Sequence, residues 1–587
     1  YRKKIYREGV RRMMFISKKK KALILMFSFL LNTIMFLLSY AFLGSVFATN
    51  DDYRMSLIVS GAYTGEPSST LVFMKYPIAW ILSELYKITP LIPWYGIAST
   101  LCILIPSIMI CYFILSDAYR AGNTKFGLML YFLFYLFIVQ KHLVLPQFTL
   151  TAAFMAIGWL VLLHHMPKDG ISPMYLLCTS IFAVISFSIR MKVFMMIFPV
   201  AIVVISANLI SNEFPNRKYI IKYIVSMVLT AILCFSVQIT DNNNTDSQYK
   251  AFNTARSLVY DFGAIPSYNE NKNFYDKAGI DETVFYDISA RYLDLDGEIT
   301  TDKMRSVANI SKSRHQGASL GKKIMRAALE APSYFLESGL LYQTAFCVIL
   351  LACAAFILCR KKKYVFVSFV FCTAAGMVLE MTYLCYISRV MDRLTEVMIL
   401  AISVSCILAL CNTFQKTDTA KCCGAARIYK AAAVLCIAFL TFYFAVSNQK
   451  AISSKADGQH LINSRLKVLN MLAASDKEAF YFYDAYDFIA ASSDTFAVYD
   501  DIVNTDSLGN WYINSSDYFK RNAKYGIRNS VDGLTDANKN IYYAAIGNLK
   551  NGITLTMKER YNLEPVIIRT VPYENNNIYI YTFIPCN

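Results

Sequence analysis

The segment Asn50-Asp51-Asp52-Tyr53 places two adjacent carboxylates directly after a long hydrophobic run, 22–46. A basic stretch, 18–21, precedes that run. By the positive-inside rule, the N-terminus then lies in the cytoplasm and the two acids lie on the outer face. Asp51 and Asp52 could act there as a general base, or could bind a hard divalent cation such as Mg²⁺ or Mn²⁺. The competing interpretation is the solvated end of a membrane span, where acids are common.

Three basic clusters break the same charge rule. Short outer loops should be poor in Lys and Arg. The exceptions are Lys141 with His142, Arg190 with Lys192, and Arg389 with Arg393. Together they could hold a phosphate or diphosphate at the membrane surface, because Arg binds oxyanions bidentately. Alternatively, each cluster contacts lipid headgroups or pairs with a local acid.

Two further polar side chains on the outer face are candidates for substrate binding. Glu66 lies between a glycine and Pro67, and could be a second acid that faces the same cavity. Gln147 begins a span and could hydrogen-bond a sugar, although capping the helix is an equal alternative. His142 could serve as a second base or a phosphate donor, or could be an ordinary polar residue at a span end.

The composition identifies a membrane protein. Of 587 residues, 56% are hydrophobic, and the mean hydropathy is +0.38. Several apolar runs reach the ~20 residues of helix that cross a bilayer core. The net charge of +17 lies mostly in short loops between these runs, where it sets orientation and contacts anionic lipid. We therefore expect no nucleic-acid partner, and we expect 22–46 to be a retained span because it shows no cleavage site.

The apolar runs predict eleven spans, with the N-terminus inside and the C-terminus outside. The segment 71–89 is amphipathic and is expected to lie in the membrane interface. Counting it as a twelfth span would place most basic loops outside, against the charge rule. The predicted spans are 22–46, 92–116, 126–140, 147–165, 173–189, 193–210, 219–239, 338–359, 364–386, 397–412 and 429–447.

This count divides the chain into five parts. A cytoplasmic basic N-terminus (1–21) precedes the first part of the transmembrane core (22–240), which contains an outer loop at 47–91. An extracytoplasmic region (241–337) separates it from the second part of the core (338–447). The last part, 448–587, is expected to be an extracytoplasmic α/β domain, because β-rich runs at 479–484, 541–545 and 577–583 alternate with helical stretches. The sequence shows no zinc, nucleotide-loop or kinase motif.

The layout resembles the GT-C superfamily of integral-membrane glycosyltransferases. Asp51 and Asp52 stand where that superfamily has an acidic motif after its first span, and 71–89 stands where it has an interfacial helix. Short stretches also resemble large uncharacterised GT-C-like proteins of Gram-positive bacteria. They are Asn50-Asp51-Asp52-Tyr53, Gly61-Ala62-Tyr63-Thr64-Gly65-Glu66-Pro67, Pro146-Gln147-Phe148-Thr149, Asn253-Thr254-Ala255-Arg256 with Tyr260-Asp261, and Gly509-Asn510-Trp511-Tyr512. This adds Arg256 and Asp261 to the candidate substrate-binding residues.

The resemblance implies an α-helical polytopic membrane protein that transfers a sugar with inversion. The donor would be a polyprenyl-phosphate-linked sugar, and the acceptor an extracytoplasmic glycan, lipid or protein. Asp51 is the expected base, Asp52 assists it, and the basic clusters bind the donor phosphate. Some members of the superfamily use a divalent metal and others do not. A lipid-linked polysaccharide flippase or polymerase, or another multi-span transporter, is the alternative function, and a membrane anchor is a third.

Overall fold

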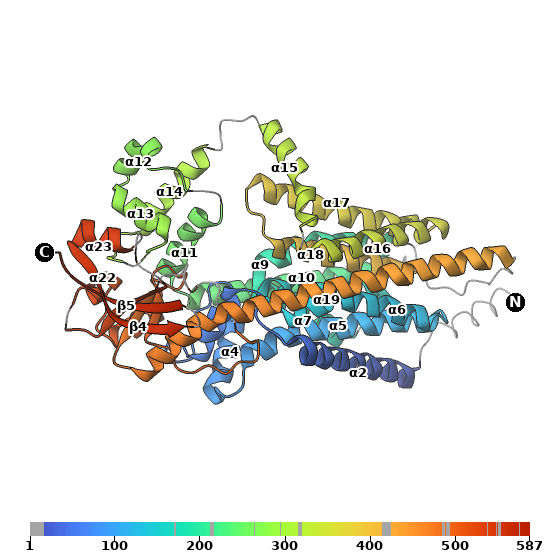
Figure 1. Ribbon diagram of the computed structural model, residues 1–587. Helices are drawn as coiled ribbons and strands as arrows, with labels where there is room; N and C mark the ends of the chain where they lie inside the picture. Colours follow the sequence, from blue (N-terminus) through green and yellow to red (C-terminus); the bar gives the residue numbers. More distant parts are fainter. Residues whose placement is uncertain are drawn as a thin grey trace.

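The computed structural model describes residues 17–586 apart from 170–171, 212–216, 263–264, 294, 315–319, 338, 414–423, 484–487, 489–492, 537, 547–548, 550–552 and 574–575. The predicted N-terminus 1–21 lies largely outside these residues. A bundle of long helices fills one part of the molecule, and a five-stranded sheet with short helices caps one end of it (Figure 1). We call these two ends of the bundle the sheet end and the opposite end.

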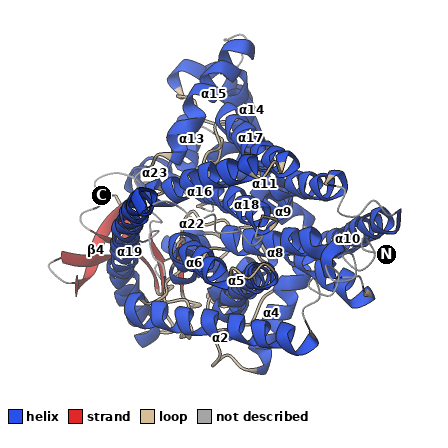
Figure 2. Cartoon of the chain, turned by 90° about the vertical axis from the view of Figure 1, so that its right-hand side faces the viewer, coloured by secondary structure: helices blue, strands red, loops and turns tan. Residues whose placement is uncertain are grey.

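Among the described residues, nine helices are long and apolar enough to cross a membrane. Their apolar side chains can face lipid on one side and neighbouring helices on the other, and α5, α6, α8 and α18 lie towards the centre of the bundle (Figure 2). The nine are α2 (Lys18–Leu43), α5 (Trp94–Arg120), the run of α6 (Thr124–Phe134), η1 (Tyr135–Val139) and α7 (Gln140–Val144), α8 (Phe148–Asp169), α9 (Pro173–Ile210), α10 (Arg217–Asn244), α16 (Leu341–Arg360), α17 (Tyr364–Tyr386) and α18 (Asp392–Cys411).

The helix α9 is a hairpin and not one straight rod. Tyr175, near its start, donates a hydrogen bond to the Leu162 carbonyl of α8 (2.8 Å), and Asn208, near its end, donates one to the His164 carbonyl (3.2 Å). A straight helix would hold Tyr175 and Asn208 about 50 Å apart, whereas their partners are two residues apart. The chain reverses at Arg190, whose backbone is non-helical (φ −153°, ψ 90°).

The predicted spans therefore coincide with helices. The spans 173–189 and 193–210 are the two arms of α9. The span 429–447 lies in α19 (Gly424–Ser475), which continues along the bundle to the sheet (Figure 1). With α9 counted twice and α19 included, the described helices run between the two ends eleven times. The number of membrane crossings and the side that the sheet faces remain predictions.

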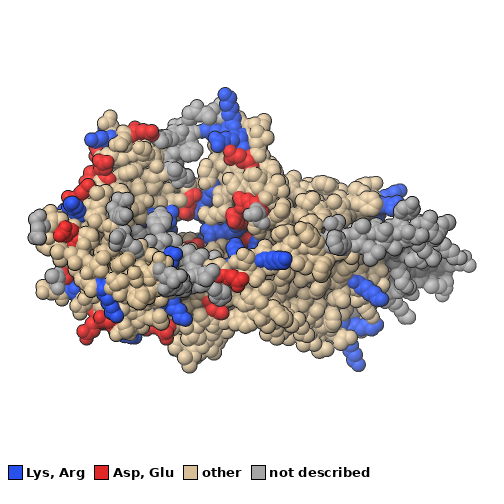
Figure 3. Space-filling view, viewed as in Figure 1, with Lys and Arg blue, Asp and Glu red and all other residues tan. Residues whose placement is uncertain are grey.

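The ambiguous segment 71–89 forms a short helix, α4 (Tyr76–Ile88). Its 13 residues extend about 20 Å, which is less than the ~30 Å hydrocarbon core. Trp80, Ile81 and Ile88 on this helix are exposed. In the face shown in Figure 3, charged side chains gather at the sheet end, and a wide part of the bundle next to them is nearly free of charge. Both features are consistent with a helix lying beside a membrane-embedded bundle.

Between α10 and α16 the chain forms a set of short helices, most of them beside the sheet and the last, α15 (Leu320–Phe335), against α17 (Figure 1). After α19 the chain forms the sheet itself. The sheet has the order β2-β1-β3-β5-β4, in which β1 pairs in parallel with β2 and β3, and β5 pairs antiparallel with β3 and β4. The remaining elements are α3 (Asn50–Ser60), α11 (Ser247–Tyr260), η2 (Asn269–Asn271), α12 (Lys272–Lys277), α13 (Glu282–Ala290), α14 (Thr301–Arg314), α15 (Leu320–Phe335), β1 (Phe480–Tyr483), β2 (Thr505–Ser507), α21 (Ser516–Ala523), α22 (Ser530–Leu534), β3 (Ile541–Ile546), α23 (Ile553–Tyr561), β4 (Leu563–Tyr573) and β5 (Asn576–Pro585).

The C-terminal region packs directly on the segment that carries the acidic pair. Ser45 donates a hydrogen bond to Thr495 (2.9 Å), 450 residues away in the chain, and Val46 forms an isolated β-bridge with Asp494. This contact interrupts the helix after α2, so that α3 starts anew at Asn50. The sequence predicted one span that continued to Val46. The structure instead ends the span at Leu43 and gives the acids a helix of their own.

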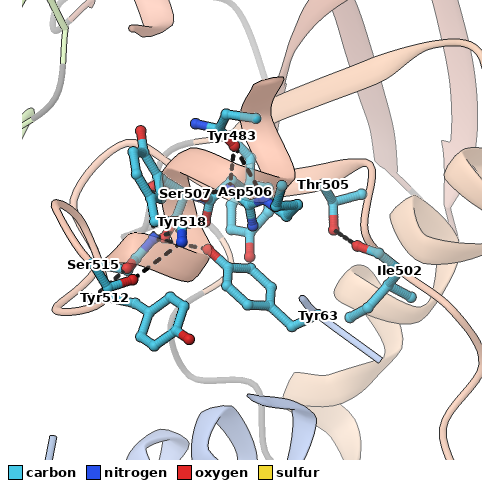
Figure 4. A network of polar contacts seen from close by, with 12 residues as sticks. Tyr63, Tyr483, Ile502, Thr505, Asp506, Ser507, Tyr512, Ser515 and Tyr518 are labelled. Atoms are coloured by element: carbon cyan, nitrogen blue, oxygen red, sulfur yellow. Dashed lines mark hydrogen bonds and ion pairs between the residues drawn. The ribbon is translucent and has the colours of Figure 1, made fainter. Parts of the chain in front are cut away.

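A buried ion pair strengthens this contact. Arg521 of α21 is fully buried and binds Asp506 of β2, which is buried as well. The Arg521 guanidinium lies 4.2 Å from the ring centre of Tyr63, in the loop after α3, and Arg54 lies 4.6 Å from the same ring. Figure 4 shows the Tyr63 side chain among the residues that surround Asp506. Tyr63 is thus held between two guanidinium groups, and it joins α3 to the sheet.

We predict that Arg521→Met destabilises the protein by about 3–5 kcal/mol, because the substitution removes the nearest cation from the buried Asp506 carboxylate and leaves it only Arg54, at 4.0 Å. The measurement is thermal unfolding of the purified protein in detergent. Arg528→Met is the matched control, since Arg528 is 84% exposed and pairs with Asp532 at the surface; it should cost no more than ~1 kcal/mol. Equal losses in the two variants would contradict this role for the buried pair.

Candidate functional site

A large basic cavity lies at the sheet end, where the bundle, the short helices and the sheet meet. Its volume is about 630 Å³. Of the residues that the structure describes, eight Lys and Arg side chains line it, but only two carboxylates do. Span ends form one wall, α11 another, and the sheet region covers it with Trp511. The charged residues that line it are Asp51, Arg54, Lys75, Arg190, Lys192, Arg256, Asp261, Arg291, Arg389 and Arg393.

The acidic pair is divided between the cavity and the protein interior. Asp51 lines the cavity and forms an ion pair with Arg393 at 3.4 Å. Asp52 is 1% exposed and lies inside. Since consecutive residues of a helix point in directions about 100° apart, the new start of α3 at Asn50 turns Asp51 to the cavity and Asp52 away from it.

Asp52 joins the starts of three helices. Its carboxylate accepts hydrogen bonds from Thr49 Oγ1 (2.7 Å), from the Tyr95 hydroxyl of α5 (2.9 Å) and from the Phe148 backbone N–H of α8 (2.9 Å). Burial raises the pKa of Asp52 to about 7, an effect that the hydrogen bonds from Thr49 and Tyr95 oppose. These contacts give Asp52 a structural role. The sequence alone did not show that Asp51 and Asp52 face different surroundings.

The loop between α17 and α18 supplies two arginines, and each has an acidic partner from a different part of the chain. Arg393 pairs with Asp51, and Arg389 pairs with Asp261 at the end of α11 (3.0 Å). Burial lowers the pKa of Arg389. The negative charge of Asp261 opposes this shift, and the positive charge of Arg393 adds to it. The two arginines therefore fix the positions of both carboxylates in the cavity.

Three other cations of the cavity have no carboxylate partner among the described residues. Arg190, at the turn of α9, lies 4.9 Å from the ring centres of both Phe73 and Phe148. The reversal of α9 also brings Lys192 to the cavity. Arg256 of α11 contacts the side-chain oxygen of Asn253 (2.8 Å), and burial lowers its pKa. Arg190 and Arg256 are half-buried, where a cation without an acidic partner is costly to hold, and Lys192 is exposed. This part of the cavity is therefore suited to an anion.

The third predicted basic cluster does not face this cavity. Lys141 forms an ion pair with Glu396 at 2.5 Å and a hydrogen bond with Gln343 at 3.1 Å, which satisfy its charge inside the bundle. Lys141, His142 and Gln147 line a second cavity of about 280 Å³. Arg393 lines both cavities. The expectation that Lys141 and His142 share one phosphate site with the other clusters is therefore not met.

Glu66 lies outside both cavities. Its side chain is 71% exposed and pairs with Lys520 at 2.8 Å, which lowers the pKa of Glu66. Among the described residues, no group of three or more His, Cys, Asp or Glu side chains could hold a metal ion. Because three donors occupy the oxygens of Asp52, the two acids do not form the paired ligand set that the sequence allowed for Mg²⁺ or Mn²⁺.

Several lining residues were missed from the sequence. Lys75 is held by Asp241 of α10 (3.1 Å), Arg54 donates a hydrogen bond to the Tyr483 hydroxyl (3.2 Å), and Arg291 comes from the end of α13. Arg54 lies two residues beyond Asp52 on α3. The signal available for Arg54 in the sequence was its charge beside the acidic pair. The positions of Lys75 and Arg291 in the cavity depend on tertiary contacts, which the sequence does not show.

The comparisons with known proteins give a distant likeness. No family model matches the chain, and no curated protein matches it. ArnT from Cupriavidus metallidurans bound to undecaprenyl phosphate has 9% identity and a TM-score of 0.39, over 96% of this chain and 98% of that chain. ArnT in the apo state has 9% identity and a TM-score of 0.40, over 94% and 97%. At these scores the likeness assigns no activity, and it gives no support to the narrower resemblance to Gram-positive proteins.

We predict that Asp52→Asn keeps the fold and that Asp52→Leu does not. An Asn oxygen can accept from Tyr95 and Phe148 while its amide donates to Thr49, whereas Leu leaves three buried donors without a partner, at about 1–3 kcal/mol each. Because the folded state raises the pKa of Asp52, it retains a proton that the unfolded chain loses. The wild-type stability should therefore fall as pH rises from about 4 to about 7.

The measurement is the unfolding temperature of both variants and the wild type across this pH range. Asp52→Asn should show a shallower decrease than the wild type between pH 4 and 7. Parallel curves for the two proteins would contradict the proton retained by Asp52.

Proposed function

We propose that this protein is a membrane glycosyltransferase of the GT-C type, and that the large cavity binds a polyprenyl-phosphate-linked sugar and its acceptor on the extracytoplasmic face. The observation that carries the proposal is one cavity that combines a carboxylate, Asp51, with several cations that lack acidic partners among the described residues. Membrane-spanning helices beside the cavity would place the lipid part of the donor.

The excess of cations suits the charge change of this reaction. A lipid-linked sugar phosphodiester carries one negative charge, and the lipid phosphate that departs carries ~1.5–2. Arg190, Lys192 and Arg256 have no carboxylate partner among the described residues and would be attracted more strongly by the departing phosphate than by the intact donor. Groups that stabilise charge as it develops lower the barrier more than they strengthen ground-state binding.

The carboxylate supplies the other half of the chemistry. Asp51 takes the proton of an acceptor hydroxyl, whose oxygen forms a bond to the anomeric carbon from the face opposite the phosphate. The bond between that carbon and the phosphate oxygen breaks, and its electron pair leaves with the lipid phosphate. Arg393 contacts Asp51 and holds the carboxylate in place before the acceptor arrives. The acceptor would be a glycan, a lipid or a protein.

We predict that Asp51→Asn lowers sugar transfer at least a hundredfold, the typical contribution of a general base. The assay follows transfer and the release of polyprenyl phosphate in proteoliposomes supplied with a polyprenyl-phospho-sugar. Asp302→Asn is the matched control, since Asp302 is 90% exposed on α14, and it should retain full activity. Full activity of Asp51→Asn would refute its role as the base. Movement of the intact donor across the bilayer by the wild type, without cleavage, would instead indicate a flippase or transporter.

We predict that Arg190→Gln weakens polyprenyl phosphate binding about ten- to hundredfold, because a hydrogen bond to a charged group is worth ~1.5–3 kcal/mol. The loss should be smaller at high salt, where ionic contacts are screened. Binding is measured with the purified protein at two salt concentrations. Arg305→Gln, at an exposed arginine of α14, is the control. Unchanged affinity in Arg190→Gln would remove Arg190 from the phosphate site.

A further inference from the structure

The second cavity is lined by buried polar side chains that have no hydrogen-bond partner in the part of the chain that the structure describes. His142 is 3% exposed and Gln147 is 6% exposed, yet no hydrogen bond of either side chain to another described residue is present. The His142 ring packs edge to face on the ring of Phe154, with 5.6 Å between the ring centres. Buried polar groups in proteins normally have hydrogen-bond partners. Two such groups that face one cavity therefore point to a polar ligand.

The balance of charge distinguishes this cavity from the larger one. The carboxylates of Asp392 and Glu396 line it together with Lys141, Lys455 and Arg393. Lys141 is neutralised by Glu396, and Arg393 by Asp51. The cavity is thus close to neutral, which disfavours a free anion. Hydroxyl groups both donate and accept hydrogen bonds, so a ligand with several hydroxyls can satisfy ammonium, carboxamide and carboxylate groups at once.

The size of the cavity sets the size of the ligand. Its volume of about 280 Å³ corresponds to about nine waters at ~30 Å³ each. That space accommodates one sugar ring and not a longer glycan. The side chains of Leu145 and Met391 supply apolar surface among the polar groups, which suits the C–H faces of a sugar ring.

Arg393 connects the two cavities. It lines both of them and contacts Asp51. Ala48 and Thr49, immediately before α3, also line the second cavity. A sugar ring in the second cavity would therefore lie next to a phosphate in the first, with the bond between them beside Arg393 and Asp51.

The geometry points to the second cavity as the site for the sugar ring of the donor, with His142, Gln147 and Lys455 as its specificity-determining contacts. This inference rests on the proposed function, and it assigns to the larger cavity the lipid phosphate and the acceptor. His142 and Gln147 then act on the sugar and not on the phosphate.

The test compares two ligands that differ only in the sugar: polyprenyl phosphate, and a panel of polyprenyl-phospho-monosaccharides from which the tightest binder is chosen. The variants are Gln147→Leu, which keeps the size of the side chain, His142→Phe, which keeps the contact with Phe154, and Lys455→Met. Lys455 is exposed at the edge of the cavity, so that this variant does not endanger folding. Each variant should weaken binding of the glycosylated ligand about five- to twentyfold, and change binding of polyprenyl phosphate less than twofold.

The outcomes separate this inference from the proposed function. Equal weakening of both ligands, or no weakening of either, would overturn the sugar site. A raised KM for the acceptor with unchanged donor binding would also overturn it, because the ring would then belong to the acceptor. Arg190→Gln should weaken both ligands alike. If the wild type cleaves no glycosyl phosphate at all, the proposed function fails, whatever the binding results.

Discussion

The arrangement of the site depends on the hydrogen bonds of one buried carboxylate. Asp52 binds Thr49 before α3, Tyr95 at the start of α5 and the Phe148 amide at the start of α8. Three chain segments are thereby fixed to one another at the sheet end. The position of Phe148 in turn determines that of Arg190, whose guanidinium rests on its ring. Asp51 is turned to the cavity by the same helix. The two acids thus have separate tasks, one in architecture and the other in the proposed chemistry.

The cavity shows how charge is managed where a bundle of apolar helices ends. Arg54, Lys75, Arg389 and Arg393 each have a carboxylate within 4.0 Å. Such partners compensate most of the cost of gathering like charges in a partly buried space. The cations that lack such a partner within the described ranges lie at the turn of α9 and on α11, and this local excess marks where an anion would be most strongly bound. The paired cations thus fix the positions of the charged side chains in the cavity, and the other cations supply its excess positive charge.

The helices were predictable from the sequence because the cost of placing charge in hydrocarbon is local and appears directly in hydropathy. The same rule identified Arg190, Lys192, Arg389 and Arg393, which line one cavity with Asp51. It could not separate them from Lys141, since the partner Glu396 lies far along the chain. The break after α2 was equally hidden, because it depends on contacts with residues 494 and 495. Local patterns revealed which residues reach the sheet end, and tertiary contacts decided which way they face.

The contact of Ser45 with Thr495 also bears on when the site can form. Translation at about 5–20 residues per second means that roughly 20–90 s pass between the synthesis of these two residues. During that interval the remaining helices of the bundle are synthesised one after another, while the segment that starts α3 lacks the chain that holds it and the cavity lacks its cover. A complete basic cavity is therefore assembled only near the end of synthesis, which keeps an incomplete chain from presenting a finished site at the membrane surface.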